Sequence, residues 1–156
     1  MLHNPFLILR LLLHVRCPSR QTDMVAVSDG FWLRRGYEAL TFFGTIVTHS
    51  QEEADMLNAR FSALKHHEMI HLRQAQSTGD SWLRFYLLYI WYWLKAQRYC
   101  RRLPNAGYRL NPFEIEAYRH MNDLGYADRC RKEGATEWRI YAAMPLDERR
   151  KFLYRQ

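Results

Sequence analysis

The 156-residue sequence has only three cysteines, five prolines and seven glycines, which excludes collagen-like, low-complexity and disulfide-scaffold classes of protein. Cys17, Cys100 and Cys130 are widely spaced and form no Cys-x-x-Cys pair, so we expect three reduced thiols rather than a cysteine zinc site. No apolar run is longer than the ten residues 85–94, whereas a membrane-spanning helix needs about 20. These absences favour a cytoplasmic globular protein.

The composition is that of one folded domain, because 48% of the residues are hydrophobic and 25% are charged. A chain of this length can bury roughly two thirds of the surface that it exposes when unfolded, which is enough for one core. A turn-rich stretch that ends at Asp23 divides the chain. Residues 1–23 are expected to be a flexible or interfacial N-terminal segment, and residues 24–156 a single domain.

Basic residues outnumber acidic residues by 23 to 16, which gives a net charge of +7 and favours an acidic partner. Between Asp80 and Glu114 the sequence has no acidic residue and six basic ones: Arg84, Lys95, Arg98, Arg101, Arg102 and Arg109. No nucleic-acid-binding motif accompanies them, so nucleic acid is disfavoured as a partner. Peripheral contact with an anionic membrane is the alternative to a solvated basic surface.

The first part of the domain has the residue pattern of β-strands. Residues 24–27 and 31–33 are predicted to be short strands around a Ser-Asp-Gly turn. Residues 40–48 are rich in β-branched and aromatic side chains and are predicted to be one longer strand.

The rest of the sequence predicts helices. Ser50 and Glu53 form a capping box, and no proline or glycine follows before Gly79, so one helix is expected to run up to that glycine. A second helix is predicted over residues 82–101, a third begins with Asn111 as its N-cap, and short amphipathic pieces complete the chain. A small N-terminal β-sheet followed by a mainly helical body makes the expected fold class α+β.

Residues 67–71 read His-Glu-Met-Ile-His, an HExxH motif inside a predicted helix. His67 and His71 are four residues apart and project from one face of the helix, so both imidazoles can bind one Zn²⁺. Glu68 lies about 100° further around the helix, where it can reach an activated water without ligating the metal.

A catalytic zinc site needs a third protein ligand. The extended motif that would place a third histidine at position 77 is absent, and the helix that begins at Asn111 offers Glu114, Glu116 and His120 instead. Glu114 is favoured because Ala117, on the same face, allows a close approach to the motif helix, although its spacing from Asn111 also suits a capping box. Glu116 and His120 remain alternatives.

Three segments together resemble a group of small bacterial zinc metallopeptidases of the HExxH…FExEA, gluzincin-like type. They are His-Glu-Met-Ile-His-Leu-Arg-Gln at 67–74, the aromatic stretch at 85–89 and Phe-Glu-Ile-Glu-Ala-Tyr at 113–118. The order of these motifs is also similar to that in heat-shock and prenyl-protein endopeptidases. This chain differs from those enzymes because Tyr118 stands where they have Asp, and because it lacks their transmembrane helices.

The resemblance implies a zincin-like fold in which His67, His71 and Glu114 hold a zinc ion and Glu68 is the general base. It also implies a peptide or protein substrate. By fold analogy, the strand over residues 40–48 corresponds to the edge strand that pairs with an extended peptide in such enzymes.

The sequence also gives expectations for two tyrosines, for His66 and for the aromatic stretch. Tyr108 and Tyr118 are candidates for stabilising an oxyanion, and His66 is expected to point away from the metal and to be exposed. The stretch 85–94 is apolar all round, which predicts a helix buried between the two metal-bearing helices. The alternative is a helix that lies in a membrane interface.

The sequence therefore favours a zinc metallopeptidase that hydrolyses peptide bonds through a metal-activated water, with Glu68 as the general base. The alternative is a non-catalytic, metal-containing basic module that binds a membrane surface or nucleic acid. A fourth protein ligand would favour this alternative, because structural zinc sites have four.

Overall fold

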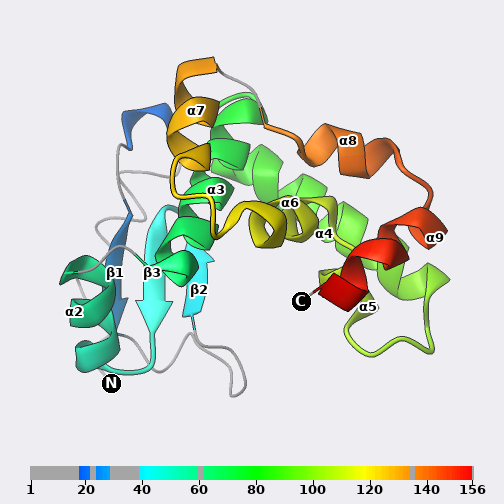
Figure 1. Cartoon of the computed structure of the whole chain (residues 1–156), viewed down its shortest axis with the longest axis horizontal. Helices are drawn as coiled ribbons and strands as arrows, with labels where there is room; N and C mark the ends of the chain where they lie inside the picture. The colour runs from blue at the N-terminus through cyan, green and yellow to red at the C-terminus, as the bar shows by residue number, and fades with distance from the viewer. Residues whose placement is uncertain (1–17, 22–23, 29–38, 60–61, 134–135, 156) are drawn as a thin grey trace.

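The computed structural model describes residues 18–21, 24–28, 39–59, 62–133 and 136–155 (Figure 1). The predicted strand over residues 31–33 and most of the N-terminal segment 1–23 lie outside these ranges. Within them, a small three-stranded sheet is followed by a mainly helical body, so the expected α+β class is confirmed.

The sheet contains β1 (Val25–Ser28), β2 (Ala39–Phe42) and β3 (Thr45–Thr48) in the order β1-β3-β2. The central strand, β3, is parallel to β1 and antiparallel to β2, and all four of its residues are buried. The side-chain amide of Asn58 exchanges two hydrogen bonds, each of 2.9 Å, with the backbone of Ala26 in β1. This side chain thus occupies part of the outer edge of β1, while β2 forms the opposite edge.

The prediction of one long strand over residues 40–48 is wrong, because a two-residue turn divides this segment into β2 and β3. Phe43 and Gly44 in the turn have φ angles of 46° and 74°, in the left-handed region. Two-residue hairpin turns commonly need positive φ, because this conformation matches the twist of the flanking strands. Gly44 is the one sign of the turn in a segment otherwise made of strand-forming residues.

The single helix predicted between the strands and Gly79 is two helices, α2 (Gln51–Ala59) and α3 (Ala63–Ser77). The predicted capping box of α2 is present, since Ser50 and Glu53 each bind the other's backbone N–H through the side chain at 3.2 Å. Ser62 is a second N-cap and accepts a first-turn N–H of α3 at 3.1 Å. The sequence pattern missed this break because no proline or glycine marks it.

The later helices are α4 (Trp82–Tyr99), α5 (Ala106–Arg109), α6 (Pro112–His120), α7 (Tyr126–Glu133), α8 (Trp138–Ala143) and α9 (Leu146–Arg149). Short 3-10 turns, η1 (Pro18–Arg20) and η2 (Arg150–Arg155), lie near the two ends of the described chain. The predicted start of α6 is confirmed, because Asn111 accepts the Phe113 N–H at 3.2 Å and Pro112 is the first helical residue. In Figure 1, α2 lies beside β1, at the opposite end of the sheet from β2.

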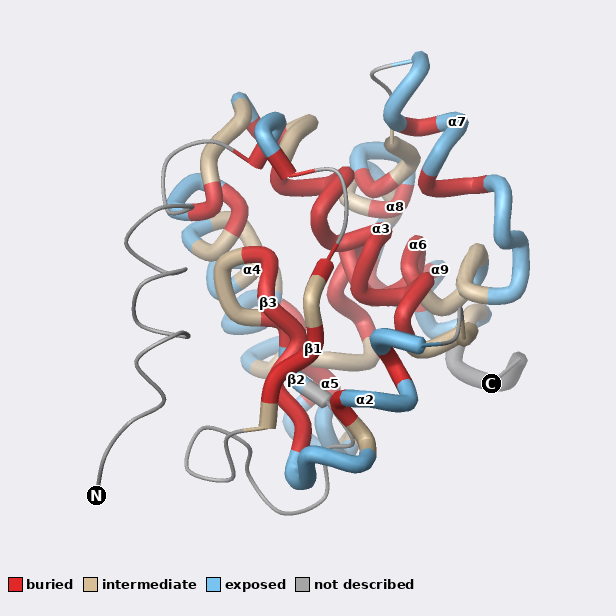
Figure 2. Tube along the Cα trace, turned by 90° about the vertical axis from the view of Figure 1, so that its left-hand side faces the viewer, coloured by how far each residue is buried: buried red, intermediate tan, exposed pale blue. Residues whose placement is uncertain are grey.

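The centre of the molecule is α3, whose residues from Lys65 to Ala75 are all buried (Figure 2). Its apolar residues Ile70 and Leu72 belong to the main core, together with Ile46 from β3 and Phe113 from α6. Polar side chains of α3 are buried as well, and a buried polar group is costly unless it is bonded. The central helix therefore needs polar partners from the elements around it.

The prediction that residues 85–94 form a helix buried on all sides is wrong. Trp82, Phe85 and Ala96 lie on the buried face of α4, which packs against α3 and α5. Leu87 and Trp91, by contrast, are 60% and 62% exposed. In the part of the chain that the structure describes, no helix is long and apolar enough to cross a membrane.

Two leucine-to-alanine substitutions test this division between buried and exposed faces. Leu72→Ala, at a fully buried position of α3, should lower the free energy of unfolding by about 2–5 kcal/mol because it leaves a cavity. Leu87→Ala, on the exposed face of α4, should change it by less than about 0.5 kcal/mol. Urea denaturation measures both. Equal losses in the two variants would show that the outer face of α4 is covered in solution.

Candidate metal centre

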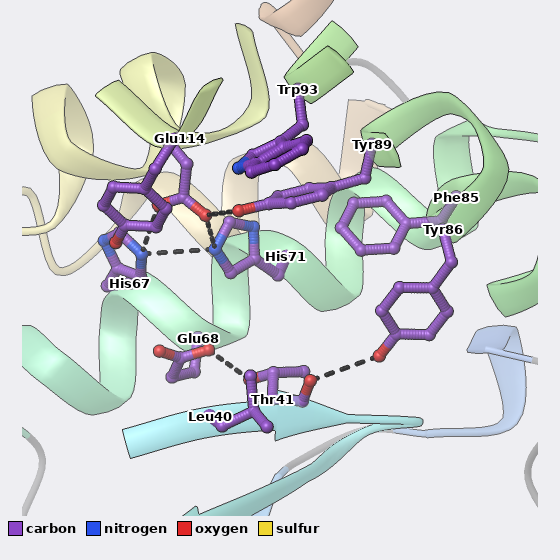
Figure 3. A pocket seen from close by; sticks show the side chains of 11 residues that line it. Leu40, Thr41, His67, Glu68, His71, Phe85, Tyr86, Tyr89, Trp93 and Glu114 are labelled. Atoms are coloured by element: carbon purple, nitrogen blue, oxygen red, sulfur yellow. Dashed lines mark hydrogen bonds and ion pairs between the residues drawn. The ribbon is translucent and has the colours of Figure 1, made fainter. Parts of the chain in front are cut away.

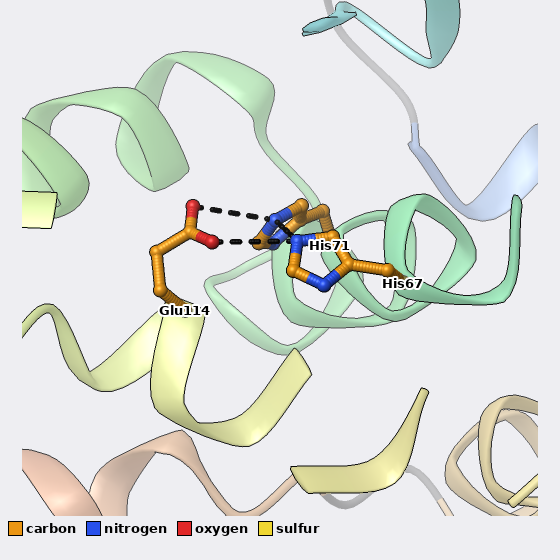
Figure 4. Close-up of side chains that lie close together, drawn as sticks. All are labelled: His67, His71 and Glu114. Carbon is orange, nitrogen blue, oxygen red and sulfur yellow. Dashed lines mark hydrogen bonds and ion pairs between the residues drawn. The ribbon is translucent and has the colours of Figure 1, made fainter. Parts of the chain in front are cut away.

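Helices α3 and α6 bring the side chains of His67, His71 and Glu114 to a common point (Figure 4). The two histidines come from successive turns of α3, and Glu114 from the first turn of α6. All three residues are buried. Among the described residues, this is the cluster of histidine, cysteine and acidic side chains that could hold a metal ion.

The separations between the donor atoms suit a tetrahedral site. His67 Nε2 lies 3.2 Å from His71 Nε2 and 3.3 Å from Glu114 Oε2, and His71 Nε2 lies 3.5 Å from Glu114 Oε1. Tetrahedral ligands at 2.0–2.1 Å from one ion are separated by about 3.3 Å. The three side chains therefore have the spacing of a first coordination shell.

The hydrogen bonds of Gln74 determine which nitrogen of His71 faces the site. The Gln74 amide donates from Nε2 to the Phe113 carbonyl at 2.9 Å and to Glu116 Oε2 at 2.8 Å. This orientation leaves Gln74 Oε1 as an acceptor, 2.7 Å from His71 Nδ1. His71 therefore carries its proton on Nδ1 and turns the lone pair of Nε2 toward Glu114 and His67, as a metal ligand does.

Two buried polar atoms of the cluster, His67 Nδ1 and Glu114 Oε2, make no hydrogen bond within the described residues. Burial raises the pKa of Glu114, but the nearby His71 and His67, together with the Tyr89 hydroxyl, outweigh it and lower the pKa to about 2. A buried carboxylate that stays ionised needs positive charge beside it, which protonated imidazoles or a bound cation can supply. A proton on His67 Nε2 can serve only one acceptor at a time, whereas a metal ion binds all three donors.

Tyr89, which belongs to the aromatic stretch 85–89 but had no predicted role at the site, orients the carboxylate. Its hydroxyl donates to Glu114 Oε1 at 2.7 Å from the second turn of α4 (Figure 3). Asn111, just before α6, donates from its side-chain amide to the Tyr89 carbonyl at 3.2 Å. These two bonds join α4 to the start of α6 and place Glu114 relative to the histidines. Only tertiary contact reveals this role, since 25 residues separate the tyrosine from the glutamate.

Glu116 lies outside the cluster, so the alternative that it is the third ligand is not supported. Its Oε1 accepts bonds from the Tyr126 hydroxyl and the Glu137 backbone N–H, both at 2.7 Å, and its Oε2 accepts from Gln74. Burial raises the pKa of Glu116, and these hydrogen bonds oppose the rise. Glu116 is therefore an anchor behind the metal centre that holds Gln74, and through Gln74 the ring of His71.

His120, the other alternative, also lies away from the cluster. Its ring stacks on Tyr126 with centroids 3.8 Å apart, and its Nε2 is 3.1 Å from Glu137. The expectation that His66 is exposed is wrong, because His66 is fully buried. It does point away from the cluster: Nδ1 lies 3.0 Å from the Met121 carbonyl, and Nε2 accepts the Ala127 N–H at 3.4 Å.

Glu68 lies beside the cluster without belonging to it. The Glu68 side chain lines the same cavity as the donor residues of the cluster, and this cavity has a volume of about 300 Å³. The Thr41 hydroxyl, from edge strand β2, donates a short hydrogen bond to Glu68 Oε2 (Figure 3). This bond engages one of the two carboxylate oxygens.

The wall of the cavity opposite α3 is aromatic. It is formed mainly by α4, through Phe85, Tyr86, Tyr89 and Trp93, and is completed by Tyr108. The Tyr108 hydroxyl lies 2.8 Å from that of Tyr118, whose ring packs edge-on against His67 with centroids 4.5 Å apart. Of the two tyrosines expected near a reacting carbonyl, Tyr108 lines the cavity and Tyr118 supports a histidine.

The metal content of variants tests whether Glu114 or Glu116 is the third ligand. His71→Ala and Glu114→Ala should each lose a bound divalent ion on dialysis, because two remaining ligands hold it weakly. Glu116→Gln should retain the ion. Its free energy of unfolding should fall by about 1–3 kcal/mol, because the new side-chain amide would place a donor opposite the Gln74 amide. Elemental analysis and urea denaturation measure both effects. Retention in Glu114→Ala with loss in Glu116→Gln would reverse the assignment.

Comparison of the chain with protein-family models, with curated proteins and with solved structures found no match in any of the three. The chemistry of the buried cluster and the cavity beside it is therefore what bears on function.

Proposed function

We propose that the chain is a zinc-dependent metallopeptidase with a zincin-like fold, in which His67, His71 and Glu114 hold one Zn²⁺. The observation that carries this proposal is the pairing of a three-donor cluster with a separate carboxylate, Glu68, in one cavity. Two imidazoles and one carboxylate form a ligand set typical of catalytic zinc, which keeps its fourth position for water or substrate. The resemblance of the motifs at 67–74 and 113–118 to gluzincin-like metallopeptidases supports the same function.

Bound Zn²⁺ would polarise the scissile carbonyl and lower the pKa of a coordinated water toward about 7. Glu68 would accept a proton from the attacking water and pass it to the leaving amine. The Thr41 hydroxyl bonds one oxygen of Glu68, and the other oxygen would accept the proton. In this scheme, β2 contributes directly to the position of the base.

Tyr108 would stabilise the oxyanion that forms when water adds to the carbonyl. Burial raises the pKa of Tyr108, as does the charge of Glu114, so its hydroxyl remains protonated and can donate. Tyr118 lies within hydrogen-bond distance of this hydroxyl and would orient it.

The cavity supports a peptide with an apolar side chain next to the bond that is cleaved. Phe85, Tyr86 and Trp93 give it a large aromatic wall, and Leu40 and Thr41 place edge strand β2 along it. An extended peptide can add to such an edge by backbone hydrogen bonds. The Tyr86 hydroxyl already donates to the Thr41 carbonyl at 3.2 Å and accepts the Phe43 N–H at 3.0 Å. Pairing would therefore involve the part of β2 before Thr41.

The alternative of a non-catalytic metal module is less well supported. A structural zinc site is closed by four protein ligands, and the cluster found among the described residues offers three. The cavity also opens beside the donors, which a site of purely structural function does not require.

The substitution Glu68→Gln tests whether the chain is a hydrolase or a non-catalytic binding module. The substitution keeps the size of the side chain and removes the base, so Zn²⁺ should remain bound while hydrolysis of quenched fluorescent peptides falls by about 10²- to 10⁴-fold. Glu53→Gln, in the exposed capping box of α2, is the matched control and should retain activity. Equal hydrolysis by Glu68→Gln and the wild-type chain, or absence of zinc from the purified wild-type chain, would contradict the proposal.

A further inference from the structure

The outer face of α4 carries a continuous apolar stripe. Leu83, Leu87, Ile90 and Leu94 recur at spacings of four, three and four residues, which places them on one side of a helix. Trp91 lies beside them, and the exposed fractions of these five side chains range from 46% to 62%. Such a stripe on one helix is larger than the isolated apolar residues that are normal on a protein surface.

Basic side chains follow one side of this stripe. At about 100° per residue, Arg84, Lys95 and Arg98 fall along the flank on which Trp91 lies. All three are exposed, as are Arg101 and Arg102 just beyond the end of the helix. At this end of the helix, Asp147 accepts a bond from the Tyr99 hydroxyl at 3.0 Å and lies 3.9 Å from Arg150. The surface around the stripe is therefore strongly positive.

The chain itself could supply two partners for this face of α4, a second copy or its own N-terminal segment. Charge argues against both. In a symmetric contact between two copies, the basic flank of one α4 would face the basic surroundings of the other. The N-terminal segment is mostly apolar at residues 6–15, but residues 1–20 contain Arg10, Arg16 and Arg20 and no acidic residue. Both contacts would bring like charges together, whereas an anionic surface would complement the patch.

We propose that this face of α4 docks on an anionic membrane surface. The helix would lie in the plane of the interface, with the leucines and Ile90 in contact with acyl chains and the basic flank in contact with lipid phosphates. Tryptophan favours this level of a bilayer, and Trp91 lies between the apolar stripe and the basic flank. Exposed aliphatic side chains at this density favour a lipid surface over nucleic acid as the partner, because proteins bind nucleic acid mainly through charge and base stacking.

The same helix would bring the metal centre to the membrane. Trp93, which is 39% exposed, lies on the other side of the stripe and lines the cavity together with Tyr86 and Tyr89. Docking through α4 would therefore hold the mouth of the cavity next to the lipid surface. This placement follows from geometry and is independent of the chemistry proposed for the cavity.

Co-sedimentation of the full chain with vesicles tests the proposal. The wild-type chain should bind vesicles of phosphatidylcholine and phosphatidylglycerol, bind pure phosphatidylcholine vesicles much more weakly, and be released as the salt concentration rises. Trp91→Glu should lower the partition coefficient at least about tenfold, because it places a charge in the apolar face. Lys95→Gln combined with Arg98→Gln should lower it about fivefold per residue at low salt.

Matched substitutions on other helices provide the controls. Ile140→Glu, at a 57% exposed position of α8, and Arg131→Gln combined with Lys132→Gln on α7 should bind vesicles like the wild type. Circular dichroism melting establishes that each variant is folded. Failure of the wild type to bind anionic vesicles, or equal binding by the α4 variants, would overturn the proposal. So would a dimer that is lost in Trp91→Glu, because a second copy would then cover the face.

Discussion

Helix α3 holds two histidine nitrogens 3.2 Å apart, and its contact with α6 brings a carboxylate beside them, in a region where all three side chains are buried. Burying an ionised carboxylate is unfavourable unless a cation or several donors compensate it. Tyr89 donates to one oxygen of Glu114, and the other lies beside His67 without a hydrogen bond. The arrangement is therefore best compensated when a cation is bound, and this requirement links the stability of the centre of the fold to its chemistry.

A second layer of polar contacts explains why so many polar residues of α3 are buried. His71, Gln74 and Glu116 form a continuous chain of hydrogen bonds, which Tyr126 and the Glu137 backbone complete. Every bond in this chain has a defined donor, so the ring of His71 has one favoured orientation. Helices α7 and α8 come much later in the sequence than His71. Through these hydrogen bonds they nevertheless help to hold its ring beside the cavity.

The local chemistry of the sequence predicted the metal-centre geometry better than the packing around it. His67 and His71 share a helix face because of their spacing, and Asn111 with Pro112 sets the start of α6, so Glu114 falls in its first turn. The break between α2 and α3 was not predictable in the same way, because serine begins the second helix without a proline or glycine before it. A pattern of side chains along one element does not reveal which neighbour will cover it.

The same limit explains the error at α4 and the omission of Tyr89. An all-round apolar helix is usually buried, but burial depends on how many other elements pack on it, and the elements that the structure describes cover α4 on one face only. Tyr89 touches Glu114 because α4 crosses the start of α6, and this crossing is a property of the tertiary fold. Thr41 joins Glu68 for a similar reason, since β2 passes beside α3.

The small sheet matters because it connects Glu68 to the aromatic wall of the cavity. Thr41 bonds Glu68 through its side chain and Tyr86 through its backbone carbonyl, and Tyr86 also binds the backbone of Phe43 in the hairpin turn. A movement of α4 would therefore be transmitted to β2 and from β2 to Glu68. Because the outer face of the same helix carries the apolar and basic surface, anything that binds this face acts on an element in direct contact with the cavity. The apolar and basic surface and the aromatic wall of the cavity are thus two faces of one helix.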